Sequence, residues 1–183
     1  MTNWQNKRVV ITGLGAITPI GKNLAEYWDG LLQGHNGVDL ITLFDASKHA
    51  CQFAAEVKDF DPYQYLDKKE AKRMDRFAQF GVCASKQAIA DANFVIDDLT
   101  ANRVGVLIGT GVGGLKVMEE QNENLLTKGP RKVSPFTIPM MIANMAAGLT
   151  AIHTGAKGPN SCTVTACAAG SHAIGDAFRL IQG

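Results

Sequence analysis

Cys167 lies where a short β-type run gives way to a helix, in the stretch Asn160-Ser-Cys-Thr-Val-Thr-Ala-Cys-Ala-Ala-Gly170. Small residues surround it, and a helix is expected from about residue 168. At such an elbow the sulfur faces the unpaired N–H groups and the positive dipole end of the following helix. That position favours the thiolate, which is the nucleophilic form of cysteine. The sequence therefore predicts a nucleophilic thiol at Cys167.

A nucleophilic thiol needs help to carry a reaction, and none of the four histidines supplies it by position. His172 follows Cys167 by five positions on the same expected helix, so its ring should project away from the thiol. His35, His49 and His153 are expected to be surface or capping residues. The sequence thus predicts an activated thiol without its base.

The other three cysteines are expected to be structural. Cys51 and Cys83 stand among apolar residues, where a free cysteine packs as a small hydrophobe. Cys162 falls in the strand that leads to the elbow, so its sulfur should pack within the sheet. No two cysteines have C-x-x-C spacing, so no metal site is predicted.

Composition limits the class of protein. A chain of 183 residues can form one domain with a sizeable core, and its formal net charge of +1 gives no reason to expect nucleic-acid binding. No apolar run approaches the ~18 residues that a membrane span needs. The polar start does not resemble a signal peptide. Reduced thiols and a cytoplasmic location are therefore expected.

The elements that must position Cys167 alternate between strand and helix, which predicts an α/β fold with a largely parallel, covered sheet. The expected strands span 7–12, 103–108 and 162–165, with short strands within 51–57, and the expected helices span 24–32, 69–91, 115–126, 139–153 and 168–181.

A glycine turn at 109–114 matches the G-x-G-x-x-G pattern between a strand and a helix, which is the setting of a dinucleotide site. Such a site also needs an acidic residue about 20 positions further on. That interval reads Gly129-Pro-Arg-Lys-Val-Ser-Pro and contains none. The glycines are therefore expected to serve tight turns where backbone or substrate approaches closely.

Basic residues cluster at two places. Lys69, Lys72, Arg73 and Arg76 would share one helix face, and Arg131-Lys132 forms a second pair. Two interpretations stay open: a solvated helix face, or a patch that binds an acidic protein or a phosphate group.

Several motifs in order along the chain resemble the β-ketoacyl-acyl-carrier-protein synthases, in particular the type II condensing enzyme of bacterial fatty-acid synthesis and its cyanobacterial members. The motifs are Arg8-Val-Val-Ile-Thr-Gly-Leu-Gly15, Phe44-Asp45, Lys69-Glu-Ala-Lys-Arg-Met-Asp75, Gly109-Thr-Gly-Val-Gly-Gly114, Gly129-Pro-Arg-Lys-Val-Ser-Pro-Phe136 and Thr165-Ala-Cys-Ala-Ala-Gly170.

The resemblance implies a thiolase-like fold of two similar α/β halves, usually a homodimer, of which residues 1–183 would be the N-terminal half. It implies that Cys167 takes an acyl chain as a thioester and that its backbone N–H is an oxyanion donor. Val112 matches a position that lines the acyl pocket. Thr137 stands where the type II enzymes often have an aromatic residue, which leaves the preferred chain length open. No cofactor is expected, because the substrates travel on the phosphopantetheine of acyl carrier protein.

The resemblance also implies an acidic partner, acyl carrier protein, docking on Lys69, Lys72, Arg73, Arg131 and Lys132. The family's catalytic histidines, its lysine and its second oxyanion donor belong to the C-terminal half. The 183-residue chain is therefore expected to lack condensation activity and to leave apolar faces uncovered. The alternatives are a polyketide ketosynthase or other thiolase-like acyltransferase, and a non-catalytic module that binds the carrier protein.

Overall fold

A computed structural model describes residues 7–183, so most of the polar start that argued against a signal peptide lies outside the described residues. The α-helices are α1 (Leu24–Leu32), α2 (Lys68–Ala71), α3 (Arg76–Asp91), α4 (Leu115–Lys128), α5 (Thr137–Met141), α6 (Met145–Thr154) and α7 (Ala169–Gln182). The strands are β1 (Val38–Leu40), β2 (Phe53–Ala55), β3 (Val106–Gly109) and β4 (Asn160–Thr163). Four 3-10 turns join them: η2 (Pro62–Gln64), η3 (Ala101–Arg103), η4 (Pro130–Lys132) and η5 (Ala166–Ala168).

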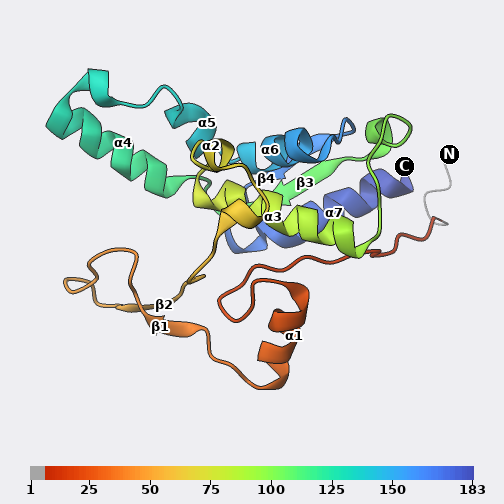
Figure 1. The fold of residues 1–183 in the computed structure, drawn as a ribbon, viewed down its shortest axis with the longest axis horizontal. Coiled ribbons are helices and arrows are strands. Elements are labelled where there is room, and N and C mark those ends of the chain that lie inside the picture. The colour runs from red at the N-terminus through yellow and green to blue at the C-terminus, as the bar shows by residue number, and fades with distance from the viewer. Residues whose placement is uncertain (1–6) are drawn as a thin grey trace.

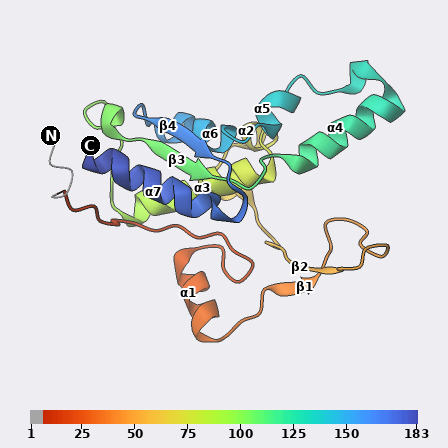
Figure 2. The ribbon, with the colours of Figure 1, turned by 180° about the vertical axis from the view of Figure 1, so that it is seen from behind.

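Two parallel strands, β3 and β4, form the centre of the molecule (Figure 1). Their register pairs Val106 with Asn160 and Gly109 with Thr163. The helix α7 covers one face of the pair, and α6 with α3 lies on the other side, as the rear view shows (Figure 2). The predicted α/β fold is confirmed. The sheet that was expected to be largely parallel consists, within residues 7–183, of this parallel pair, and β1 and β2 form a separate antiparallel pair.

The core lies between α2, α3 and α6. Small and apolar side chains of α3, including Ala78, Val82 and Cys83, pack against Ala146 at the start of α6. Small residues let the two helices approach closely, so the helix layer is held by backbone proximity as well as by apolar burial.

The strand expected at 7–12 does not form. A strand needs a neighbouring backbone to pair with, and none lies beside this segment within residues 7–183. The chain instead runs on to α3, where the Leu14 N–H donates to Asp91 (2.8 Å) and the Ala16 N–H donates to Gln87 (3.0 Å). Ile11 is left exposed.

Two of the predicted helices are broken. The helix expected at 69–91 divides into α2 and α3, because Gln79 of α3 turns its amide back to donate to the Ala71 and Met74 carbonyls (2.9 and 3.4 Å). That side chain satisfies the open carbonyls at the end of α2. The helix expected at 139–153 divides into α5 and α6 at Ile142, whose backbone is extended.

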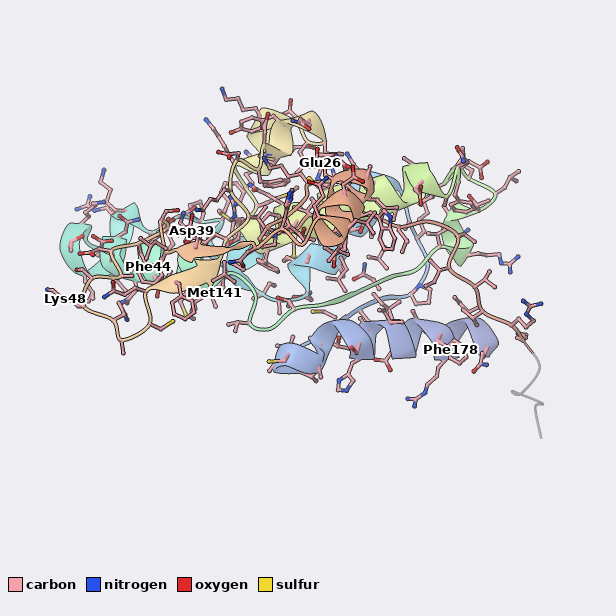
Figure 3. All side chains as sticks on the ribbon, turned by 90° about the horizontal axis from the view of Figure 1, so that it is seen from below. Glu26, Asp39, Phe44, Lys48, Met141 and Phe178 are labelled. Atoms are coloured by element: carbon pink, nitrogen blue, oxygen red, sulfur yellow. The ribbon has the colours of Figure 1, made fainter. Side chains whose placement is uncertain are left out.

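The segment of α1 and the β1–β2 hairpin stands apart from the helices around the central strands (Figure 1). The hairpin is antiparallel and pairs Val38 with Ala55. Its strand β2 lies within the range expected to hold short strands. Figure 3 shows Asp39, Phe44 and Lys48 at this end, on the opposite side from Phe178 of α7. No helix among residues 7–183 is long and apolar enough to cross a membrane.

Candidate active site

The elbow around Cys167 is a tight turn between β4 and α7. The chain leaves β4 at Thr163, passes through η5 and enters α7 at Ala169. Ala166 takes a left-handed backbone conformation (φ +50°), which is uncommon for a residue with a side chain. The next residue, Cys167, is exposed, and its sulfur makes no hydrogen bond within residues 7–183. The strained turn thus presents a free thiol at the start of a helix.

The start of α7 is fixed directly on the ends of the central strands. The Thr163 hydroxyl donates to the Ala169 carbonyl at 2.8 Å. A β-carbon at Gly109 would overlap that same carbonyl, so the absence of a side chain in β3 allows the contact. Neither role was predicted, although a hydroxyl residue at the end of the strand before the elbow is a recognisable signal. These contacts determine where Cys167 lies.

The surroundings of the thiol favour negative charge. The backbone N–H of Cys167 donates no hydrogen bond within residues 7–183, so it remains available to an oxygen beside the sulfur. The first turn of α7 contains no acidic residue to compete for the positive end of the helix dipole. An oxyanion formed here would therefore be stabilised electrostatically.

The histidines do not serve the thiol. The His172 ring nitrogen Nδ1 lies 2.8 Å from the Thr165 hydroxyl, and within residues 7–183 the ring makes no hydrogen bond to Cys167. This agrees with the prediction that His172 projects away. His153 was expected to be a surface or capping residue: it lies in the last turn of α6, where its side chain is only 11% exposed and lies 3.7 Å from the Glu70 carboxylate.

The remaining cysteines divide into two kinds. Burial raises the pKa of the Cys83 thiol to about 11, with Lys86 acting in the opposite direction. Burial also raises the pKa of Cys162, whose sulfur lies 3.4 Å from the Ala143 carbonyl oxygen. Both match the prediction of packed, structural thiols. The prediction for Cys51 is wrong, because the β1–β2 hairpin holds that residue outside the core and leaves it exposed.

The glycine turn after β3 emerges at the same edge of the sheet as the elbow. The Thr110 N–H donates to the Thr163 carbonyl (3.1 Å), so both turns leave the carboxyl ends of adjacent parallel strands. Val112 in this turn is 65% exposed. Thr137, which begins α5, is partly buried, and its hydroxyl donates a hydrogen bond to the Ser134 carbonyl (2.6 Å). The strand order places Val112 and Cys167 on one edge, which is where α/β proteins bind ligands.

Close backbone packing accounts for most of the glycines in this turn. A β-carbon at Gly113 would lie 2.7 Å from the Met141 carbonyl oxygen, and one at Gly114 would lie 2.6 Å from that of Met140. Only Gly111 faces open space. The turn is therefore built to fit against α5, as the tight-turn interpretation expected.

All five predicted docking residues are exposed, in two groups. Lys69, Lys72 and Arg73 lie on and just after α2, whereas Arg131 and Lys132 form η4 at the outer end of α4 (Figure 1). The Arg73 guanidinium lies over the ring of Phe136 at 4.7 Å, so the first group contacts the segment that follows η4; this contact was not predicted.

Arg76, which was expected on the same face, turns inward instead. Its guanidinium lies over the rings of Phe60 and Phe80 and donates to the Val57 carbonyl. The break between α2 and α3 is the physical reason, because it ends the helical spacing on which the shared face was predicted.

Known proteins with similar sequences are condensing enzymes. The profile of the family "Beta-ketoacyl synthase, N-terminal domain" matches residues 6–183. A 3-oxoacyl-[acyl-carrier-protein] synthase 2 of Synechocystis is 69% identical over the whole chain, and one of Staphylococcus aureus is 50% identical over 97% of it. The chain spans 44% and 43% of the lengths of these relatives.

Solved structures that resemble this chain are also ketosynthases. A beta-ketoacyl synthase from Burkholderia phymatum shares 30% identity with this chain, with a TM-score of 0.82; the match covers 96% of this chain and 43% of that one. The ishigamide ketosynthase/chain length factor shares 28% identity, with a TM-score of 0.84; the match covers 96% of this chain and 44% of that one. A type II polyketide ketosynthase in complex with its acyl-carrier protein shares 25%, with a TM-score of 0.81 over 96% of this chain and 47% of that one. The elbow cysteine thus stands in a thiolase-like fold, and the chain belongs to the beta-ketoacyl synthase family, whose N-terminal domain it contains.

Proposed function

We propose that this chain supplies the acyl-accepting part of a 3-oxoacyl-acyl-carrier-protein synthase of fatty-acid elongation, with Cys167 as the nucleophile. The observation that carries the proposal is the exposed thiol with its own free backbone N–H at the start of α7. A thiol in this setting is suited to attack a thioester carbonyl and to hold the product.

In the first step the Cys167 thiolate attacks the carbonyl carbon of an acyl-phosphopantetheine thioester. The new bond joins that carbon to the Cys167 sulfur, and the carbonyl oxygen carries the negative charge of the tetrahedral intermediate. The Cys167 N–H stabilises this charge. The bond to the phosphopantetheine sulfur then breaks, and the released thiolate takes up a proton.

In the second step malonyl-carrier protein loses carbon dioxide, and its carbanion attacks the carbonyl carbon of the Cys167 thioester. A carbon–carbon bond forms, the bond from that carbon to the Cys167 sulfur breaks, and the cysteine leaves as a thiolate. The product is a 3-oxoacyl-carrier protein two carbons longer. Within residues 7–183 no histidine forms a hydrogen bond with the Cys167 thiol. His172 is hydrogen-bonded to the Thr165 hydroxyl, and His153 lies beside the Glu70 carboxylate. We therefore expect the 183-residue chain to accept an acyl group and not to condense it.

The carrier protein would dock on the exposed basic residues of α2 and η4. One solved relative was determined as a ketosynthase in complex with its acyl-carrier protein, which supports a partner of this kind. The Arg73–Phe136 stack supports a surface shared by the two basic groups. A homodimer of the complete enzyme, a cytoplasmic location and the absence of a cofactor belong to the same proposal.

Fatty-acid elongation is favoured over polyketide synthesis by the sequence identities. The relatives named 3-oxoacyl-acyl-carrier-protein synthase 2 share 69% and 50% identity with this chain, whereas the polyketide ketosynthase in complex with its carrier shares 25%. Thr137, the first residue of α5, belongs to the proposal as a position that affects the preferred acyl chain length.

Mass spectrometry of the chain after incubation with acyl-carrier protein tests the assignment of the nucleophile. We expect one acyl group on Cys167, and no adduct in Cys167→Ser. The matched control is Cys51→Ser, which removes the other exposed thiol and should leave acylation unchanged. Carrier binding without an adduct would identify a non-catalytic docking module instead.

Charge reversal tests the docking surface. Lys72→Glu combined with Arg131→Glu should weaken carrier binding more than about tenfold at low salt, because each variant sets a like charge against an acidic partner. Lys157→Glu, an exposed lysine outside both groups, is the control. Equal effects of the two changes in a titration would contradict this surface.

A further inference from the structure

Asp75 is a buried carboxylate whose partner lies outside its own helix. The residue occupies the N-cap position of α3, yet its side chain caps nothing there. It is only 8% exposed. Its Oδ2 accepts a hydrogen bond from the Val117 N–H at 3.3 Å, 42 positions further along the chain. A buried carboxylate must be compensated, so this contact has to contribute to the fold.

The contact supplies the cap that α4 lacks. The N-cap residue of α4 is Gly114, which has no side chain to bond the open N–H groups of the first turn. Val117 is the third residue of that helix, the position whose N–H an N-cap side chain normally bonds. A negative charge there also interacts favourably with the helix dipole. Asp75 therefore acts as an N-cap for α4 from a different helix.

The other charged groups around Asp75 have partners of their own. A cavity of about 230 Å³ beside Asp75 is also lined by Arg76, Lys116 and Glu120. Arg76 donates to the Val57 carbonyl, and Lys116 pairs with Glu120 at 3.8 Å. The hydrogen-bond partner of the Asp75 carboxylate is thus the Val117 N–H, at the amino-terminal end of α4.

The same carboxylate lies against the backbone of the glycine turn. A β-carbon at Gly114 would lie 2.9 Å from Asp75 Oδ2, and the Gly114 N–H donates to the Met141 carbonyl at 2.9 Å. Gly113 has φ +98°, a conformation that residues with a side chain rarely adopt. The turn therefore depends on its contacts to keep this conformation. Val112 immediately precedes these residues, and the direction of its side chain follows from theirs.

We propose that Asp75 is a positioning residue that holds Val112 toward the acyl chain by capping α4 and fixing the turn before it. The inference rests on the proposed function, because Val112 is taken to line the acyl pocket. Asp75 also lies only two positions after Arg73, so one short segment reaches from the docking surface to the turn.

Hydrogen exchange on the 183-residue chain tests the positioning directly. Asp75→Ala should make the amides of residues 112–118 exchange roughly five- to tenfold faster, with β4 and α7 unchanged. Asp75→Asn keeps an acceptor and loses only the charge, so its increase should be about two- to threefold. Unchanged exchange at 112–118 in Asp75→Ala would overturn the proposal.

The consequence for substrate choice is measured as acylation of Cys167 by carrier-free acyl-pantetheines of increasing length. Val112→Ala and Asp75→Ala should both alter the order of preference among chain lengths, and Asp75→Asn should largely restore it. A uniform loss at every length in Asp75→Ala would show a merely structural residue and overturn the proposal. If Val112→Ala leaves the preference unchanged while acylation continues, the assigned acyl pocket is wrong, and this inference is overturned with it.

Discussion

The four cysteines differ in whether the fold leaves their sulfur accessible as a thiolate. Cys83 and Cys162 are shielded, and burial raises the pKa of both thiols, that of Cys83 to about 11. Cys51 and Cys167 are exposed. Accessibility therefore separates the structural thiols from those that can react.

This difference predicts the pattern of alkylation. Because only the thiolate reacts, a raised pKa leaves Cys83 protonated and inert at pH 8, and its reactive fraction should rise as the pH approaches 11. Iodoacetamide should label Cys51 and Cys167 within minutes and Cys83 only after unfolding, as peptide mass spectrometry would show. Fast labelling of Cys83 in the folded chain at pH 8 would contradict the burial described here.

Single residues were predictable where neighbours along the chain decide their surroundings. The burial of Cys83 was predicted from its apolar neighbours and is confirmed, and the elbow position of Cys167 followed from the strand-to-helix change. The burial of Cys51 was predicted from apolar neighbours such as Phe53, but the hairpin has no covering layer within residues 7–183 and Phe53 is itself exposed. The composition of a short segment does not determine whether another layer of the fold covers that segment.

At the scale of elements, the contact between β3 and the start of α7 depends on one missing side chain. Gly109→Ala should destabilise the chain by about 2 kcal/mol, since the added carbon overlaps the Ala169 carbonyl and must push α7 away. Denaturant unfolding measures this cost. The acylation rate of Cys167 should fall as well, because α7 carries the elbow.

Gly111→Ala is the matched control, since a β-carbon there has nothing within 4 Å and the backbone is not left-handed. Its effect on the free energy of unfolding should stay within about 0.5 kcal/mol. A cost at Gly111 equal to that at Gly109 would show that glycine flexibility matters, and not the packing of α7.

The existence of most helices was predictable, but their breaks were not. The helices expected at 115–126 and 168–181 correspond to α4 and α7, and the apolar face of the helix expected at 69–91 lies mostly on α3. The division between α2 and α3 depends on the Gln79 amide and on the Asp75 contact with α4, which involve residues up to 42 positions apart. The strand expected at 7–12 failed for a related reason, since β-type residues form a strand only beside a partner backbone.

At the scale of the whole molecule, α7 leaves an apolar stripe uncovered. Ala169 and Ala173 are buried against the central strands, whereas Ile174 and Phe178 on the other side are 73% and 43% exposed. Figure 3 shows α7, with Phe178 labelled, along one side of the molecule. Exposed apolar stripes of this kind promote association.

The 183-residue chain should therefore self-associate with increasing concentration, in line with the expectation that it leaves apolar faces uncovered. Ile174→Lys combined with Phe178→Lys should weaken association more than about tenfold, since each buried side chain of this size contributes ~1.5–3 kcal/mol. Leu99→Lys, at a highly exposed position outside α7, is the control. Equal sedimentation behaviour of the two variants would exclude α7 as the contact surface.

The parallel pairing of β3 with β4 has a consequence for the order of folding. Val106 pairs with Asn160, 54 positions further along the chain, and the connection between them contains three helices. Closing such a loop is entropically costly, so contacts of this separation form late and slow the folding rate. The elbow exists only once this pairing is made and α7 has docked on it. A newly synthesised chain therefore gains the elbow that exposes Cys167 only when folding is nearly finished.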